Sequence, residues 1–211
     1  MSVRALGAFA VLAIAGVAGG YGVSALQTDA PLTISVAAPV PAASPSYPVT
    51  EYDVEPDPDD APLATGLPLE AAKLRANGKR LEFRVPEGWS RGGELPNAIF
   101  TADRSATNTY QLRVTGLGGL SSQRVEVMNR INALRDAEAN EQLENLVIET
   151  QGDDRFVATY LQGGYRRVSM ERFLVLGDSG ATAAVAAVGR EADRDGLQDL
   201  LTRVSDSLRL G

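Results

Sequence analysis

The sequence predicts an α+β domain in which a mostly antiparallel sheet is flanked by helices, preceded by one transmembrane helix and a disordered tether. Three observations lead to this prediction. An N-terminal run of 22 residues carries no charge, a stretch rich in proline and acids follows it, and the remainder alternates between strand-like runs and two helical spacings. We therefore divide the chain into residues 1–26, 27–69 and 70–211.

The first part predicts a membrane anchor. Residues 5–26, ALGAFAVLAIAGVAGGYGVSAL, are long enough to cross a hydrocarbon core about 30 Å thick at about 1.5 Å per residue. Because Arg4 precedes the run and acids follow it, the N-terminus is expected in the cytoplasm and the rest outside the cytoplasmic membrane. A signal peptide cleaved near Ala25 stays open as the alternative, since the small residues there suit a cleavage site.

The second part, residues 27–69, predicts a tether. It holds nine of the eleven prolines and seven acidic residues without a basic one, so it cannot bury enough apolar area to offset the entropy of ordering. Its acids Asp53, Glu55, Asp57, Asp59 and Asp60 are separated by prolines and lack the glycine turn of a calcium loop, so we expect no metal there.

Composition limits the function of the third part. The net charge of −7 belongs to the tether, and from Lys73 onward 19 basic and 19 acidic residues balance, which argues against a nucleic-acid partner. The chain has no cysteine and no histidine, so the usual thiolate nucleophiles, metal ligands and neutral-pH bases are missing. We therefore expect no enzyme activity, cofactor or metal. An enzyme that uses carboxylates stays open as an alternative, ranked third among the possible functions.

Strands are predicted in chain order from alternation and turn residues. Asn77-Gly78 is a hairpin dipeptide before a run in which Leu81, Phe83 and Val85 share a face, and Pro86-Glu87-Gly88-Trp89 ends that run. Further strands are expected over residues 98–102, 110–115, 146–150, 156–162, 166–176 and 182–188, the last three forming a meander.

Two helices are predicted from apolar spacing. The first starts after Ser121 or Ser122, runs to about Leu143 and buries a face with Val127, Ile131, Leu134 and Ala137. The last is capped by Asp195, with Gln198 three residues on. Its buried face holds Leu197, Leu200, Leu201, Val204 and Leu208.

One glycine-rich stretch, QLRVTGLGGLSSQRVEV, has the Gly116-x-Gly118 spacing of a dinucleotide-binding loop. However, Ser121 replaces the third glycine, and Glu149, the candidate ribose-binding acid, follows too far along the chain. We therefore expect a strand-to-helix connection whose glycines permit tight turning and whose serines cap the helix.

Two charged motifs are also interpreted structurally. Glu191, Asp193 and Asp195 match the start of a calcium loop, but Thr202 stands where that loop needs a bidentate glutamate. Arg166 and Arg167 are interpreted as protection of an edge strand rather than as a site for an anionic headgroup or glycan.

A resemblance rests on RLEFRVPEGWS, residues 80–90. This stretch resembles the opening of PsbP-like domains, where a strand ends in a Val-Pro-x-Gly-Trp turn, and actinobacterial LpqN-type envelope proteins and type VII secretion-associated membrane proteins resemble it in the same way. The resemblance implies an α/β/α sandwich and an exported binding or scaffolding module, and it transfers no site residue. The lipobox cysteine of LpqN-type proteins is absent.

The sequence thus leads to one expected function and one further alternative. We expect a membrane-anchored, non-catalytic extracytoplasmic scaffold for a cell-envelope complex, with the membrane (through residues 5–26) and a protein of that complex as partners. The alternative is a carrier of a small ligand or lipid, with an apolar pocket between sheet and helix.

Overall fold

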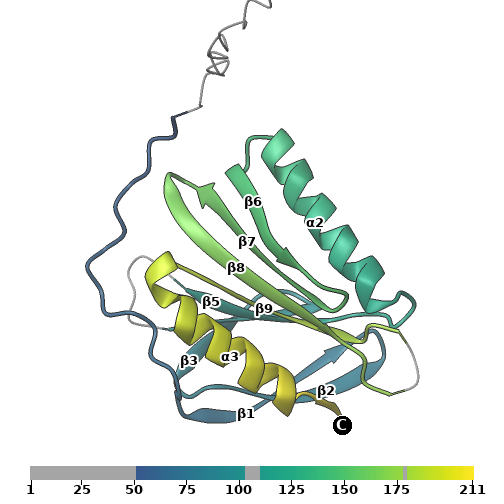
Figure 1. Ribbon diagram of the computed structural model, residues 1–211. Coiled ribbons are helices and arrows are strands. Elements are labelled where there is room, and N and C mark those ends of the chain that lie inside the picture. Colours follow the sequence, from purple (N-terminus) through teal and green to yellow (C-terminus); the bar gives the residue numbers. More distant parts are fainter. Residues whose placement is uncertain (1–50, 103–109, 178–179) are drawn as a thin grey trace, which may run out of the picture. The chain divides into compact units, whose positions relative to one another are not determined.

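The computed structural model describes residues 51–102, 110–177 and 180–211 (Figure 1). Its elements in chain order are β1 (Leu69–Ala76), β2 (Lys79–Pro86), β3 (Trp89–Gly92), β4 (Asn97–Ala102), β5 (Gln111–Gly116), α2 (Gln123–Ala139), β6 (Glu144–Gln151), β7 (Arg155–Gln162), β8 (Tyr165–Leu174), β9 (Ala183–Gly189), the 3-10 turn η1 (Glu191–Asp193), α3 (Arg194–Ser207) and β10 (Arg209–Leu210). The predicted anchor, residues 5–26, lies outside these ranges. Within them, no helix is both long and apolar enough to cross a bilayer.

The strands form two sheets instead of the single one expected. The large sheet has the order β3-β4-β5-β9-β8-β7-β6, and the small sheet has the order β1-β2-β10. Every paired neighbour in both sheets is antiparallel. The α+β class with mostly antiparallel strands and two helices is therefore confirmed, and the meander β7-β8-β9 is as predicted.

The small sheet begins with the predicted hairpin. Asn77 and Gly78 have φ of 50° and 73°, the positive values that a two-residue turn of this kind needs. Leu81, Phe83 and Val85 are buried on one face of β2, as their alternation predicted.

The domain has three layers: α2, the large sheet, and α3 together with the small sheet. Two apolar clusters lie between these layers. On one face of the large sheet, α2 places Val127, Ile131 and Leu134 against Phe156 and Phe173. On the opposite face lies the larger cluster, which joins α3 and the inner face of the small sheet to β4, β5, β8 and β9. The helices thus lie on opposite faces of the large sheet, with the small sheet beside α3.

Helix ends differ from the sequence-based predictions. Ser122 caps α2, but the helix ends at Ala139, and Glu141 has a φ of 57° that a helix cannot accommodate. Asp193, not Asp195, is the N-cap of α3, and Asp195 lies in the first turn. The end of α3 at Ser207 releases the last residues to form β10.

The predicted tether needs a correction over residues 51–68, which we call the strap. This segment belongs to the compact unit Thr50–Gly211 and runs along the domain (Figure 1). Leu63 is buried and joins the larger apolar cluster, and Gly196 of α3 has no room for a side chain because it faces the Leu63 carbonyl. The composition of this stretch did not predict order, because the partners that hold it lie far away in sequence.

Candidate functional site

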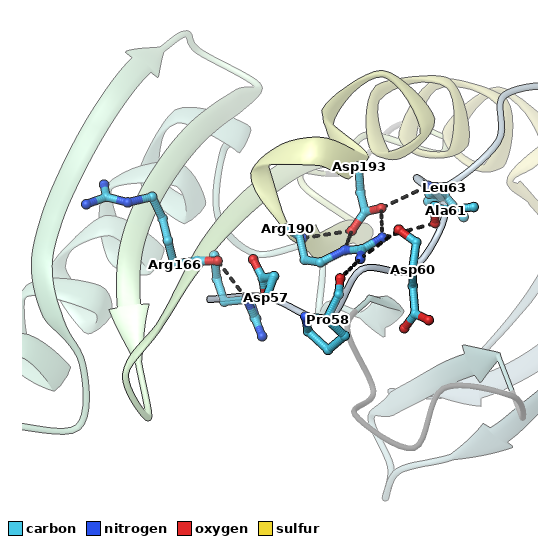
Figure 2. A network of polar contacts seen from close by, with 9 residues as sticks. Asp57, Pro58, Asp60, Ala61, Leu63, Arg166, Arg190 and Asp193 are labelled. Atoms are coloured by element: carbon cyan, nitrogen blue, oxygen red, sulfur yellow. Dashed lines mark hydrogen bonds and ion pairs between the residues drawn. The ribbon is translucent and has the colours of Figure 1, made fainter. Parts of the chain in front are cut away.

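A buried ion pair fastens the strap to the domain. Arg190 follows β9 and Asp193 ends η1, and both side chains are almost fully buried, at 2% and 0% exposure. Nε of Arg190 donates to Oδ2 of Asp193 and Nη2 donates to Oδ1, each at 2.8 Å. We call this bidentate pair the clamp (Figure 2).

The clamp binds the strap through its backbone. Arg190 Nη1 donates to the carbonyls of Pro58 and Asp60 at 3.0 and 3.2 Å, and Nη2 donates to the Ala61 carbonyl at 3.1 Å. Oδ1 of Asp193 accepts the Leu63 N–H at 2.8 Å (Figure 2). A proline-rich segment lacks the N–H groups that it would need to pair as a strand of a sheet, so no neighbouring strand satisfies its carbonyls. Where these carbonyls are buried they need other donors, and Arg190 supplies them.

Contacts on either side of the clamp extend this fastening. Before it, the Glu55 N–H donates to the Gly164 carbonyl at 2.9 Å, and Arg167 Nη1 donates to Asp57 at 2.7 Å. After it, the Gly66 N–H donates to Asp199 at 2.8 Å. The strap is therefore held at several points from Glu55 to Gly66.

Arg166 and Arg167 lie at the start of β8, where they pair with Leu161 and Tyr160 of β7. Strand β9 pairs with β8 only from Val168 onward, so among the residues that the structure describes the other side of β8 has no strand partner at these two arginines. The Arg167 guanidinium lies 5.0 Å from the centre of the Tyr165 ring and pairs with Asp57 of the strap. Arg167 thus binds the strap through an ion pair.

Both residues of the clamp, Arg190 and Asp193, carry a charge. Burial pushes the pKa of the Asp193 carboxyl upward, but the hydrogen bonds from Arg190 and from the Leu63 N–H outweigh it, so the pKa lies below its ordinary value. The hydrogen bond to Asp193 raises the pKa of Arg190. Both groups are thus ionised at neutral pH, which makes the bonds to the strap charge-assisted.

A second candidate site is a groove of about 380 Å³ between α2 and the uncovered part of the large sheet. At its floor the nearly buried Glu171 carboxylate accepts from Arg130 of α2 at 3.0 Å and from Arg113 of β5 at 3.3 Å. In the sheet register, Ala186 of β9 lies between Arg113 and Glu171, and its small side chain lets the arginine pass over it. The lining combines polar side chains such as Asn97 and Thr115 with apolar ones such as Leu117 and Phe173, so the groove is mixed in character.

The glycine-rich stretch is a strand-to-helix connection. A side chain at Gly116 would overlap the Cβ of Ala76, so this glycine permits close contact between β5 and β1. The turn itself uses Gly119, with a φ of 78°. Since β9, β8 and β7 separate β5 from β6, the strands flanking α2 are not the adjacent parallel pair of a dinucleotide fold.

The remaining acids found among the sequence candidates have other partners. Both carboxylate oxygens of Glu149 accept from Arg194 of α3 at 2.8 and 2.9 Å, and Glu191 pairs with the same guanidinium at 2.7 Å. In residues 51–211 outside the two gaps, no three acids, histidines or cysteines gather as a metal site would require. Asp193 belongs to the clamp.

Arg190 was missed by reasoning from sequence. Its contacts with the strap join residues about 130 positions apart, so no local pattern could reveal them. The one local signal is its spacing of three residues from Asp193 at the entry to a helix, which fits an ion pair as well as it fits the calcium-loop interpretation.

No protein-family model matches the chain, and no curated protein matches it. The resemblance to PsbP-like domains therefore stays a prediction.

Proposed function

We propose that the protein is a non-catalytic accessory module of the cell envelope, anchored in the cytoplasmic membrane by residues 5–26, with its domain on the outer side as a scaffold for a protein complex. The PsbP-like α/β/α sandwich belongs to this proposal. The order of layers, with helices on both faces of an antiparallel sheet, supports it.

The clamp is the observation that carries the proposal. A linker that only connected the domain to an anchor would need no buried arginine, yet here Arg190 directs three donor bonds at strap carbonyls. Fastening residues 51–68 leaves residues 27–50 as the linker to the proposed anchor, and the chain enters the domain at one fixed place.

The test is affinity purification of the full chain from membranes solubilised in mild detergent. We expect a protein partner at constant stoichiometry. An Arg190→Met variant, which loosens the strap, should recover less of that partner, whereas Arg124→Gln on the exposed side of α2 should recover as much as the wild type. A monomer that co-purifies with nothing under these conditions would contradict the proposal.

The carrier alternative is supported by the groove beside α2, whose lining combines apolar side chains with charged ones. Arg113 and Arg130 suit a small ligand with a carboxylate or phosphate group. Thermal shift measurements against cell-envelope extracts separate the two functions, because a carrier gains stability from its ligand and a scaffold does not.

A further inference from the structure

The small sheet presents a basic surface on its outer side. Leu74, Leu81 and Phe83 point into the core, so the alternation of a strand places their neighbours on the opposite face. Arg209 joins that face from β10, where it is paired with Glu82. We call this surface the basic face, and its basic residues are Lys73, Arg75, Arg80, Arg84 and Arg209.

Glu82 is the acid at the centre of the basic face. Its carboxylate lies 3.1 Å from Arg209, 3.2 Å from Arg80 and 3.8 Å from Lys73. The hydrogen bond from Arg209 is the main reason why the pKa of Glu82 lies below its ordinary value. One carboxylate thus orients three cations and neutralises only one charge, which leaves the face strongly positive.

Arg75 and Arg80 stand directly opposite each other on β1 and β2. Like charges in this position destabilise an antiparallel pair, so the stability of the sheet does not explain them. Within the part of the chain that the structure describes, neither Arg75 nor Arg84 has a carboxylate partner for its guanidinium. Beside the pair, at the Asn77-Gly78 turn, the surface forms a hollow of about 530 Å³.

The charges of the basic face are accessible. The side chains of Lys73, Arg80 and Arg209 are 59%, 40% and 73% exposed. They project from a paired sheet, so their spacing is fixed by the backbone. An array of five cations around one carboxylate fits an extended anionic surface better than a single small ligand.

We propose that the basic face docks on the anionic phospholipid headgroups of the membrane that holds the anchor. This inference rests on the proposed function, because the proposed anchor keeps the domain at that membrane. When the face touches the headgroups, the surface potential of anionic lipids attracts each basic residue by about 1 kcal/mol, so removing two of them should weaken docking about thirtyfold.

The experiment uses the full chain reconstituted in lipid nanodiscs that carry a dansyl-labelled headgroup. Trp89 is the only tryptophan and is the first residue of β3, three residues after the end of β2, so energy transfer from it reports how near the adjoining end of the small sheet is to the bilayer. We expect strong transfer in discs that contain phosphatidylglycerol and weak transfer in pure phosphatidylcholine. Transfer should fall to the weak level at about 1 M salt, where the Debye length is about 3 Å.

Matched variants make the test specific. Arg75→Gln with Arg80→Gln removes two charges from the basic face and relieves their repulsion, so the fold should be as stable as before while energy transfer is lost. Arg124→Gln with Arg135→Gln removes two charges from α2 and should leave transfer unchanged. Equal transfer in anionic and neutral discs, or equal loss in both double variants, would overturn the proposal.

Two other outcomes separate this inference from the proposed function. If the double variant of the basic face loses a co-purified protein while energy transfer stays high, the face binds an acidic protein and membrane docking is wrong. If the chain is released by cleavage near Ala25, the membrane anchor of the proposed function fails. Sedimentation of the released chain with phosphatidylglycerol vesicles then decides the docking inference by itself.

Discussion

Arg190 and Asp193 show how two buried charges can be accommodated in a small domain. Removing such groups from water costs several kcal/mol for each ion, and this cost is offset only when the pair is well oriented and the remaining donors and acceptors are satisfied. Here the guanidinium reaches two carboxylate oxygens and three carbonyls, and the carboxylate also accepts the Leu63 N–H. The strap therefore completes the hydrogen bonding of the pair.

The first prediction concerns the loss of one clamp partner. Arg190→Met should destabilise the domain by about 3–5 kcal/mol, because it leaves a buried carboxylate without its cation. Urea unfolding followed by circular dichroism measures the change. The control is Arg194→Met, whose partners Glu149 and Glu191 are partly exposed, so its cost should stay near or below about 1 kcal/mol. Similar costs for the two variants would contradict the special role of the clamp.

The second prediction concerns pH. The pKa of Asp193 is lowered by folding, so the stability that its charge contributes is fully present above the unfolded-state pKa near 4 and is lost as the pH falls through the lower, folded-state pKa. We expect the urea midpoint of the wild type to drop on acidification below about pH 4. Asp193→Asn should be less stable at neutral pH and should show a smaller drop, and an equal drop in both proteins would exclude Asp193 as a contributor.

The third prediction separates two glycines that the sequence treats alike. Gly116→Ala should cost about 1–3 kcal/mol, because the new methyl group meets Ala76 in a packed contact. Gly118→Ala should change stability by less than about 0.5 kcal/mol, since a methyl group there finds only ordinary contact with Leu120. Thermal unfolding of both variants measures the two losses of stability. A larger loss in Gly118→Ala than in Gly116→Ala would contradict the packing described for Gly116.

At the scale of elements, periodicity alone predicted most of the strands and both helices. Alternation at Leu81, Phe83 and Val85 and the helical spacing of Val127, Ile131 and Leu134 reflect burial on one face, which is visible in any single segment. The division into two sheets, the short β10 and the end of α2 depend on tertiary pairing, so local patterns could not reveal them. The same hairpin alternation also places Arg75, Arg80 and Arg84 on one face, a signal for the basic face that was present but not used.

The fourth prediction concerns the start of α2. The sequence left Ser121 and Ser122 as alternative caps, and in the structure the Ser122 hydroxyl accepts from the Val125 N–H at 3.4 Å. Ser122→Ala should therefore cost about 0.5–1 kcal/mol. Ser121→Ala is the control, because Ser121 contributes its backbone carbonyl to Ala181, and its unfolding midpoint should match that of the wild type.

For the whole molecule, the two candidate surfaces lie on opposite outer layers. The basic face is the outer side of the small sheet, and α2 with its groove covers the far face of the large sheet. A domain that docked through the basic face would turn α2 and the groove away from the bilayer. Membrane contact and recruitment of a partner are therefore compatible in one orientation.

The fifth prediction concerns the contribution of the strap to the whole fold. A chain that begins at residue 69 should be less stable than one that begins at residue 51, because it exposes the cluster under Leu63 and leaves Arg190 without its carbonyl partners. The loss of Leu63 burial alone is about 1.5–3 kcal/mol. Urea unfolding of the two chains measures the difference, and equal stability would show that the strap is an accessory to the fold and not part of it.

The strap also determines how mechanical load would enter the domain. Tension on the linker would reach the contacts of Glu55 and Asp57 first, then the three carbonyls held by Arg190, and only afterwards Leu63 and the sheets. Each contact that yields lengthens the free chain and lowers the force on the next. In the proposed membrane-anchored protein, the clamp would thus yield before the sheets do and limit the force on the folded domain.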